Sequence, residues 1–344
     1  MRNQNILYVC VNDGSDTRVI KEISTLSKEY KVFYLGIGTK SESSFSLEMT
    51  EQHILISGSH KSIGTILKLV WQLILLLYKF NFKKVHVVDE QLYCFIFPLL
   101  IGKRVTLDIF DSYFLKLNLP GNKFYLLKRI IYGLPRKIIV TDENRYSLLP
   151  KFAQEKAVVI PNVPRFAKYF KKRNTNDYLT ICYFGSLNKD RGTYFLEKLL
   201  HYDDNIKVIA AGWLTDDYTK LFVNHPRVTF LGIKKQSDVN AILAEKGDYL
   251  LSVYPVNNTN NIYASPNKIY DAIQTQTPII INSEIFVASF VKNINIGYVI
   301  KNSLNIDFEK LIFELKEKRN SYSFNDKLVE EYSWEKYETK LLNL

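Results

Sequence analysis

Short apolar runs alternate with amphipathic segments along the first half of the chain. The runs are rich in Val, Ile and Tyr and are flanked by turn residues, which is typical of buried strands. Strands are expected over residues 6–11, 32–35, 53–56, 85–88, 104–109, 137–141 and 158–160. Helices are expected over 17–28, with Asp16 as N-cap, and over 62–80. This alternation predicts a doubly wound parallel sheet, which binds ligands beyond the carboxyl ends of its strands.

A second alternating series follows a polar segment that contains prolines. Further strands are expected over 179–184, 206–211, 228–231, 249–254, 278–281 and 298–300, and helix from Asp307 to the end. Pro161, Pro164 and the basic run 168–177 indicate a linker. We therefore predict an α/β protein with two facing Rossmann-like domains and a cleft between them. The predicted boundaries are 1–165 for the first domain, 166–177 for the linker, 178–330 for the second domain and 331–344 for a C-terminal helical segment.

The composition is that of a globular protein in a reducing compartment. Hydrophobic residues make up 47% of the 344 residues, too many for a disordered chain. Cys10, Cys94 and Cys182 lie in apolar runs without metal-ligand spacing, so we interpret them as buried thiols of a cytoplasmic protein. The apolar run 66–80 is too short to span a bilayer and carries Lys68.

The net charge of +11 is concentrated in the first half of the chain. Residues 116–137 hold six basic side chains and no acidic one, interleaved with aromatic residues. This pattern favours contact with an anionic surface, such as the inner leaflet of the cell membrane or a lipid-diphosphate acceptor, through Lys123, Lys128 and Arg129. A solvated basic face is the plain alternative. Nucleic acid is the other, but the chain contains no nucleic-acid-binding motif.

The segment Ser265–Ile273 carries the most chemistry. Ser265 suits a helix N-cap and Pro266 the first helical position, while apolar residues four apart would face the core. Lys268 and Asp271 lie three apart on another face of that helix. A helix start and a lysine suit phosphate, and a carboxylate can accept from ribose hydroxyls. The segment thus predicts a nucleotide-diphosphate site, with an ordinary capped surface helix as the alternative.

Two glycine-containing turns point toward the same kind of ligand. Gly185 is expected to end the first strand of the second domain, and Arg191 and Gly192 to open the helix that follows. Glycines let a backbone approach a ligand closely, and an arginine can fork onto a phosphate. Gly212, expected just after a strand, is a weaker indication of the same kind.

Together these features resemble the retaining glycosyltransferases of family four, which have the GT-B fold, and in particular the members that build bacterial surface polysaccharides. The resemblance spans nearly the whole chain and rests on the order and spacing of its motifs. These motifs are Asp16-Thr-Arg18, Ile160-Pro-Asn162, Tyr183-Phe-Gly-Ser186 with Arg191-Gly192, Phe230-Leu-Gly232, Pro266-Asn-Lys-Ile-Tyr-Asp271, Thr277-Pro-Ile279 and Tyr332-Ser-Trp334.

The resemblance implies roles for individual residues. Asp271 would bind the donor ribose, Lys268 and Arg191 the diphosphate, and the backbone after Gly232 the base. The stretch around Asp111 would lie on the acceptor side, in the first domain, and the helix around Trp334 would cross back to brace that domain. The full implied donor-binding set is Gly185, Ser186, Arg191, Gly212, Gly232, Ser265, Pro266, Asn267, Lys268 and Asp271.

Three positions differ from the family pattern. Tyr263 stands where the family often has a second acidic residue, Ser186 where it often has an arginine, and Phe110 where a histidine is common. These differences bear on the donor sugar and on how the leaving group is held.

The predicted function is transfer of a sugar from a nucleotide-diphosphate donor to an acceptor hydroxyl, and the resemblance implies that the sugar is a hexose. The family implies retention of configuration. If the reaction inverts instead, Asp13, Asp16 and Asp111 are the candidate catalytic bases. We expect neither a metal ion nor another cofactor, because the chain has no D-x-D pair and no His/Cys metal spacing. The alternatives are a nucleotide-sugar 2-epimerase on the same fold and a non-catalytic partner subunit.

Overall fold

The computed structural model describes residues 4–169, 171, 177–301 and 303–344. The chain divides into two compact units. The N-terminal unit comprises residues 1–162 together with Glu335–Leu344, and the C-terminal unit comprises Val163–Trp334. The division therefore falls slightly before the predicted boundary at 165. Of the predicted linker 166–177, residues 170 and 172–176 lie outside the described residues.

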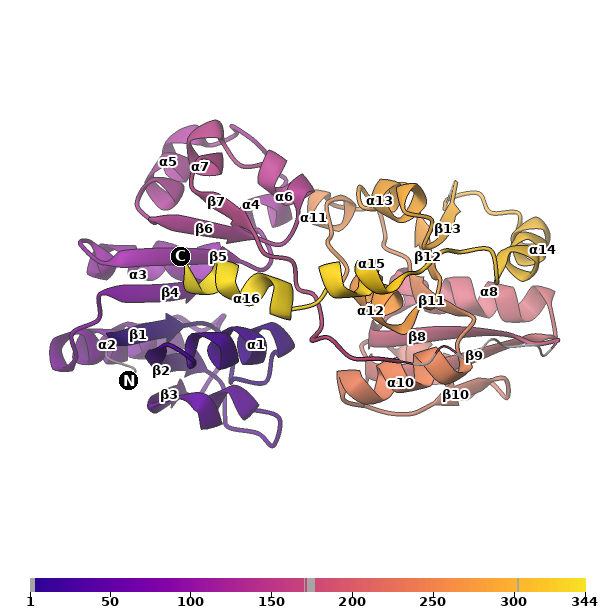
Figure 1. Cartoon of the computed structure of the whole chain (residues 1–344), viewed down its shortest axis with the longest axis horizontal. Helices are drawn as coiled ribbons and strands as arrows, with labels where there is room; N and C mark the ends of the chain where they lie inside the picture. Colours follow the sequence, from indigo (N-terminus) through magenta and orange to yellow (C-terminus); the bar gives the residue numbers. More distant parts are fainter. Residues whose placement is uncertain (1–3, 170, 172–176, 302) are drawn as a thin grey trace. The chain divides into compact units, whose positions relative to one another are not determined.

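The N-terminal unit is built on one parallel sheet with the strand order β3-β2-β1-β4-β5-β6-β7 (Figure 1). Its central strand, β4, is buried on both sides, as a parallel strand between two helical layers must be. The strands are β1 Gln4–Val9, β2 Tyr30–Ile37, β3 Gln52–Ile56, β4 Lys84–Val88, β5 Arg104–Ile109, β6 Lys137–Val140 and β7 Ala157–Val159.

Helices cover both faces of this sheet. The β1–α1–β2 and β3–α2–β4 connections run in opposite directions along the sheet, so right-handed crossovers place α1 and α2 on opposite faces. Helices α2, α3 and α5 share one core cluster, whereas α16 packs beside α1. These helices are α1 Thr17–Leu26, α2 Ile63–Lys79, α3 Glu90–Ile96, α4 Tyr113–Lys116, α5 Tyr125–Gly133, α6 Glu143–Ser147, α7 Lys151–Gln154 and α16 Glu335–Leu342, with short 3₁₀ turns at Phe45–Met49 and Phe97–Leu100.

The C-terminal unit repeats the plan with a parallel sheet in the order β10-β9-β8-β11-β12-β13. Its strands are β8 Leu179–Leu187, β9 Ile206–Leu214, β10 Val228–Phe230, β11 Tyr249–Ser252, β12 Ile279–Asn282 and β13 Gly297–Ile300. Its helices are α8 Tyr194–Tyr202, α9 Asp217–Phe222, α10 Gln236–Lys246, α11 Thr259–Ile262, α12 Lys268–Thr275, α13 Ala288–Asn293, α14 Phe308–Lys318 and α15 Asp326–Glu331. A doubly wound parallel sheet in each half is thus confirmed.

Several local predictions were wrong. Strands β8 and β9 pair in register through Gly185 and Gly212, so both glycines lie inside strands and not after them. The pairing continues because Gly212, which has no side chain, lets the backbone of Gly185 approach closely. A short helix, α11, interrupts the expected loop before Ser265. Cys94, predicted to be buried, is only partly buried. The chain beyond Asp307 is mainly helical, as predicted, in the three helices α14, α15 and α16. None of the helices in the described ranges is long and apolar enough to cross a membrane.

Candidate functional site

Two cationic side chains lie close together at the carboxyl ends of β8 and β11. Lys268, the first residue of α12, donates from Nζ to the Leu251 carbonyl at 3.2 Å and lies 4.6 Å from the centre of the Tyr183 ring. Arg191 lies in the turn before α8, with its guanidinium 5.2 Å from the centre of the Tyr254 ring. Aromatic faces attract cations without neutralising them, so both side chains keep the ability to bind an anion.

Burial and the neighbouring positive charge of Arg191 make it unfavourable for Lys268 to carry its charge when no anion is bound. Burial and, to a lesser extent, the positive charge of Arg191 together lower the pKa of Lys268 to about 7, against the opposing effect of Asp271. No ion pair with a carboxylate of the described chain relieves either cation. An anion bound between them would therefore restore the charge on Lys268 and stabilise the site.

The start of α12 differs from the prediction. The helix begins at Lys268, and its N-cap is Asn267, whose side chain makes no capping hydrogen bond. Asn267 already has helical dihedral angles, and its carbonyl accepts from the Tyr270 amide. Ser265 and Pro266 therefore lie before the helix. The predicted cap at Ser265 is therefore wrong, although the helix and its two buried isoleucines, Ile269 and Ile273, are confirmed.

Asp271 points toward α10. Its Oδ1 accepts from Gln236 Nε2 at 2.8 Å and from Asn240 Nδ2 at 3.0 Å. In this structure Lys268 and Asp271 thus have separate partners, and a hydroxyl ligand at Asp271 would have to share or displace two amides. Sequence reasoning missed Gln236 and Asn240, since nothing in the local pattern of α10 indicates which partner its polar side chains face.

Three glycines leave the adjoining strand ends without side chains. Gly185 has φ +101°, Gly212 +138° and Gly232 +68°, a region that favours glycine. A Cβ on Gly212 would lie 1.8 Å from the Gly185 carbonyl oxygen, whereas one on Gly185 or Gly232 would meet nothing within 4 Å. The open sides of Gly185 and Gly232 are where a ligand could approach the backbone. Ser186, next to them, is exposed.

The three predicted acceptor-side aspartates all have partners within the N-terminal unit. Asp13 Oδ1 accepts from the Ser15 hydroxyl at 2.5 Å, and Asp16 caps α1 through the backbone amide of Arg18 at 2.8 Å. Burial raises the pKa of Asp111, but Arg145 and Lys116 outweigh it and the pKa is lowered. The Asp111 carboxylate is therefore a weaker base than an unpaired aspartate. Asp16 is confirmed as the N-cap of α1.

Sequence reasoning missed Asp89, the residue that follows β4. Its backbone has φ +72° and ψ 137°, a strained conformation for a residue other than glycine, and its Oδ1 is buried without a hydrogen-bond partner. Burial and, to a lesser extent, the negative charge of Asp111 together raise the pKa of Asp89 to about 7. A carboxylate held this way at the carboxyl end of a parallel strand suits a hydroxyl ligand. Its position after the strand 85–88 was a signal that the sequence offered.

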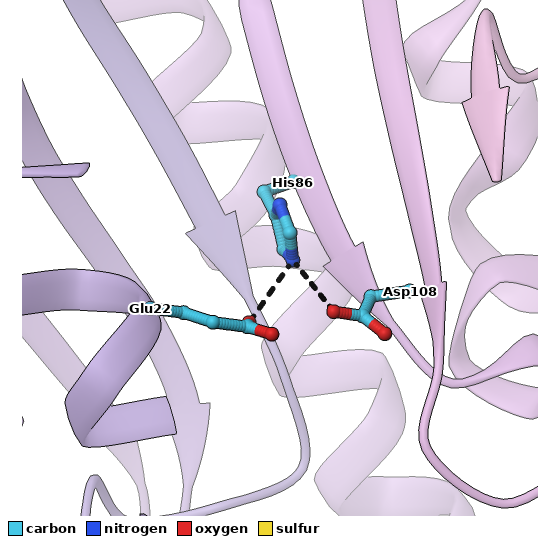
Figure 2. Close-up of side chains that lie close together, drawn as sticks. All are labelled: Glu22, His86 and Asp108. Carbon is cyan, nitrogen blue, oxygen red and sulfur yellow. Dashed lines mark ion pairs between the residues drawn. The ribbon is translucent and has the colours of Figure 1, made fainter. Parts of the chain in front are cut away.

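A buried charge cluster ties α1 to the sheet behind these aspartates. Arg18 donates to both oxygens of Asp108 at 3.0 Å and to Glu22 at 2.8 Å. His86 Nε2 lies 3.3 Å from Glu22 and 3.5 Å from Asp108 (Figure 2). Burial opposes its charge, but the two carboxylates raise the pKa of His86 to about 9. The Phe110 ring covers the guanidinium at 4.8 Å.

Glu22, His86 and Asp108 are also the one group of metal-ligand type found in the described chain. Arg18 occupies both oxygens of Asp108, and the Tyr8 hydroxyl donates to Glu22 at 2.7 Å. Two cations already balance two carboxylates, so a metal ion would have to displace a buried guanidinium. We therefore interpret the cluster as structural.

The predicted basic face requires a correction. Lys123 and Arg129 are exposed, but Lys128 is buried and donates from Nζ to the Leu119 and Gly121 carbonyls at 2.6 and 2.7 Å. Lys128 ties α5 to the loop before it because its position on the helix faces the core, beside Ile131 and Tyr132. It is not part of a surface for lipid or acceptor.

Neither a protein-family model nor a curated protein sequence matches the chain. Solved structures do match. Anabaena HepE, in complex with UDP and glucose, superposes with a TM-score of 0.73 at 11% identity over 99% of each chain. Sucrose-phosphate synthase from Thermosynechococcus elongatus gives 0.72 at 12% identity, over 98% of this chain and 97% of that one. The chain has the GT-B fold.

A glycosyltransferase from Rickettsia africae extends the similarity, with a TM-score of 0.64 at 12% identity over 100% of this chain and 94% of that one. The GT-B fold confirms the predicted fold class. UDP and glucose are ligands of HepE. At these identities the similarity establishes the fold, and the donor and acceptor roles of individual residues stay predictions.

Proposed function

We propose that this chain is a glycosyltransferase that moves a sugar from a nucleotide-diphosphate donor to a hydroxyl of a glycan or lipid-linked acceptor. The observation that carries the proposal is the pair Lys268 and Arg191, two cations held near each other, neither of them in an ion pair with a carboxylate of the residues that the structure describes. Such a pair suits a diphosphate. The UDP complexes of HepE, which shares the fold, support the same reading.

The hard step of this reaction is departure of the diphosphate as negative charge develops on it. Lys268, Arg191 and the start of α12 would stabilise that charge, which is the task a metal ion performs in other transferases. We therefore propose a metal-independent reaction with no cofactor besides the donor. The resemblance to family four adds retention of configuration, with the leaving phosphate helping to deprotonate the acceptor.

On the N-terminal unit, Asp89 is the carboxylate best suited to an acceptor hydroxyl, because one of its oxygens is buried without a partner. Three aspartates stay candidates for the base of an inverting reaction, namely Asp13, Asp16 and Asp111. To act as a base, each would have to give up an existing hydrogen bond or ion pair. From the family resemblance we propose that the reaction serves bacterial capsule, O-antigen or exopolysaccharide assembly, in the cytoplasm and at the inner face of the membrane. There, Lys123 and Arg129 would face lipid.

The first test is a thermal-shift screen with nucleotides and nucleotide sugars on the wild type, Lys268→Met and Asp271→Ala. A nucleotide at a hundred times its dissociation constant should stabilise the wild type by about 2.7 kcal/mol. We expect Lys268→Met to lose at least tenfold in affinity for nucleoside diphosphates. Lys246→Met, at the exposed end of α10, is the control and should bind like the wild type.

The alternatives give different results. An epimerase would convert the nucleotide sugar to its 2-epimer in the absence of acceptor, whereas a transferase would at most hydrolyse it slowly. A non-catalytic subunit would show no shift with any nucleotide and would form a stable complex with a partner transferase. Either result would overturn the proposal.

A further inference from the structure

Helix α2 exposes a continuous stripe of large apolar side chains. One side of the helix packs Leu69, Leu73 and Leu76 into the core of the N-terminal unit. The opposite side leaves Ile63 79% exposed, Trp71 60% and Tyr78 93%. The full stripe is Ile63, Leu67, Trp71, Ile74, Leu75 and Tyr78. Their separations of three and four place them on one helical face, and a contiguous apolar face of this size on a soluble surface marks an interaction site.

The charges around this stripe are of one sign. Residues 52–88 contain five lysines and no Asp or Glu. Lys61, Lys68 and Lys79 are exposed in or beside α2 itself. A protein partner would commonly offer mixed charges, whereas an anionic lipid surface offers only negative ones, which this segment complements throughout. Trp71 and Tyr78 are the residue types that favour the headgroup region of a bilayer.

The same helical layer carries a second surface of this type. Helix α5 shares the core cluster of α2 and therefore covers the same face of the sheet. It exposes Leu126 and Ile130 beside Arg129, and residues 112–141 contain no acidic side chain. The outer surface of this layer is thus apolar and basic at both helices, away from the carboxyl-end aspartates.

We propose that α2 docks the N-terminal unit on an anionic membrane, lying in the headgroup region with its apolar stripe toward the acyl chains. The helix is too short to cross a bilayer, but its two apolar sides allow it to pack on the sheet and insert into the interface at once. This inference extends the membrane contact proposed above from α5 to α2, and it does not depend on the donor.

The test is flotation of the full chain with vesicles of phosphatidylcholine alone and with 30% phosphatidylglycerol, about the anionic content of a typical cytoplasmic leaflet. The variant is Leu67→Gln/Trp71→Gln/Tyr78→Gln. The matched control is Leu221→Gln/Ile233→Gln/Phe313→Gln, three equally exposed apolar residues of the C-terminal unit. We expect the wild type and control to float with anionic vesicles, and the α2 variant to lose at least tenfold in partitioning.

Further measurements separate the outcomes. In a Trp213→Phe background, brominated acyl chains should quench Trp71, whereas Trp334 is fully buried. Wild-type flotation by the α2 variant, or no flotation of the wild type with either vesicle, would overturn the proposal. So would a dimeric wild type that the α2 variant renders monomeric, because the stripe would then join two copies. The nucleotide-induced thermal shift should be unchanged in the α2 variant, which shows that it folds and keeps this inference separate from the proposed activity.

Discussion

Single residues in this protein are held in states that cost stability. Lys268 is kept half-buried beside another cation, and Asp89 is kept in a strained backbone conformation with an unpartnered oxygen. Neither arrangement contributes to folding. Since groups with shifted pKa values and strained backbones concentrate where ligands bind, these two residues are the strongest candidates for direct contact with substrate.

Asp89→Asn should stabilise the protein while weakening its activity. The folded-state pKa of about 7 lies above that of an unfolded aspartate, so the stability of the wild type falls as pH rises from about 4 to 7. Asparagine removes this dependence and should raise the free energy of unfolding at pH 8 by on the order of 1 kcal/mol. Urea unfolding at pH 5 and 8 measures the difference.

The control for this prediction is Glu51→Gln, which replaces an exposed carboxylate. It should leave the free energy of unfolding unchanged at both pH 5 and pH 8. A destabilised Asp89→Asn variant at pH 8 would mean that the carboxylate supports the fold. The functional interpretation of Asp89 would then be wrong.

At the scale of elements, the buried cluster joins α1 to β4 and β5. His86 is protonated in the folded state up to a pKa of about 9 and in the unfolded state only up to about 6.5. Its contribution is therefore fully present below pH 6.5 and is lost as pH rises through 9.

The melting temperature of the N-terminal unit should accordingly fall between pH 6.5 and 9, with a loss of about 2 kcal/mol. Calorimetry can follow this unit as the transition that nucleotide does not shift. His86→Gln should flatten the pH profile, and His60→Gln, at an exposed turn, should keep it. If the stability of the two variants falls equally with pH, a group other than His86 is responsible for the pH dependence.

The paired ends of β8 and β9 depend on Gly212. Gly212→Ala places a Cβ 1.8 Å from the Gly185 carbonyl and should cost about 3 kcal/mol, because the two strands must separate. Gly102→Ala, also at a positive φ but with open space, should cost about 1 kcal/mol. Thermal unfolding and nucleotide titration should show that only Gly212→Ala loses binding. Similar losses of stability and of nucleotide binding in both variants would mean that backbone strain alone is responsible.

At the scale of the whole molecule, the chain passes between its two units twice. The last helix, α16, belongs to the N-terminal unit, where Glu338 accepts from Thr25 at 3.1 Å and pairs with Lys28 of α1. Leu341 is buried in the same contact. Stability of the first unit thus depends on residues 335–344, which follow the second unit in the chain.

Leu341→Ala should lower the free energy of unfolding of the N-terminal unit by about 2–3 kcal/mol, through lost burial and the cavity that remains. The nucleotide-stabilised transition of the C-terminal unit should not move. Leu126→Ala, with the same change on an exposed face, is the control and should alter neither transition. A shift in the nucleotide-stabilised transition would show that α16 supports both units.

Much of this protein was determined by its sequence alone. Apolar runs, apolar residues four apart and capping residues are local features of the sequence, so they predicted both parallel sheets, the buried face of α12 and the cap at Asp16. The presence of Lys268, Arg191 and Asp271 near strand ends could also be predicted, since parallel strands share an edge where such residues gather.

Tertiary structure alone decided what each polar side chain faces. Lys128 is surrounded by basic and apolar surface residues in sequence, yet it turns inward because helical phase places it beside two carbonyls. Asp271 bonds amides of α10, over 30 residues away in the chain. Asp89 combines a strained backbone with an oxygen that is buried without a partner, and the charge of Asp111 helps to raise its pKa. Burial, charge proximity and hydrogen-bond partners depend on distances between segments remote in sequence, and no local pattern encodes those distances.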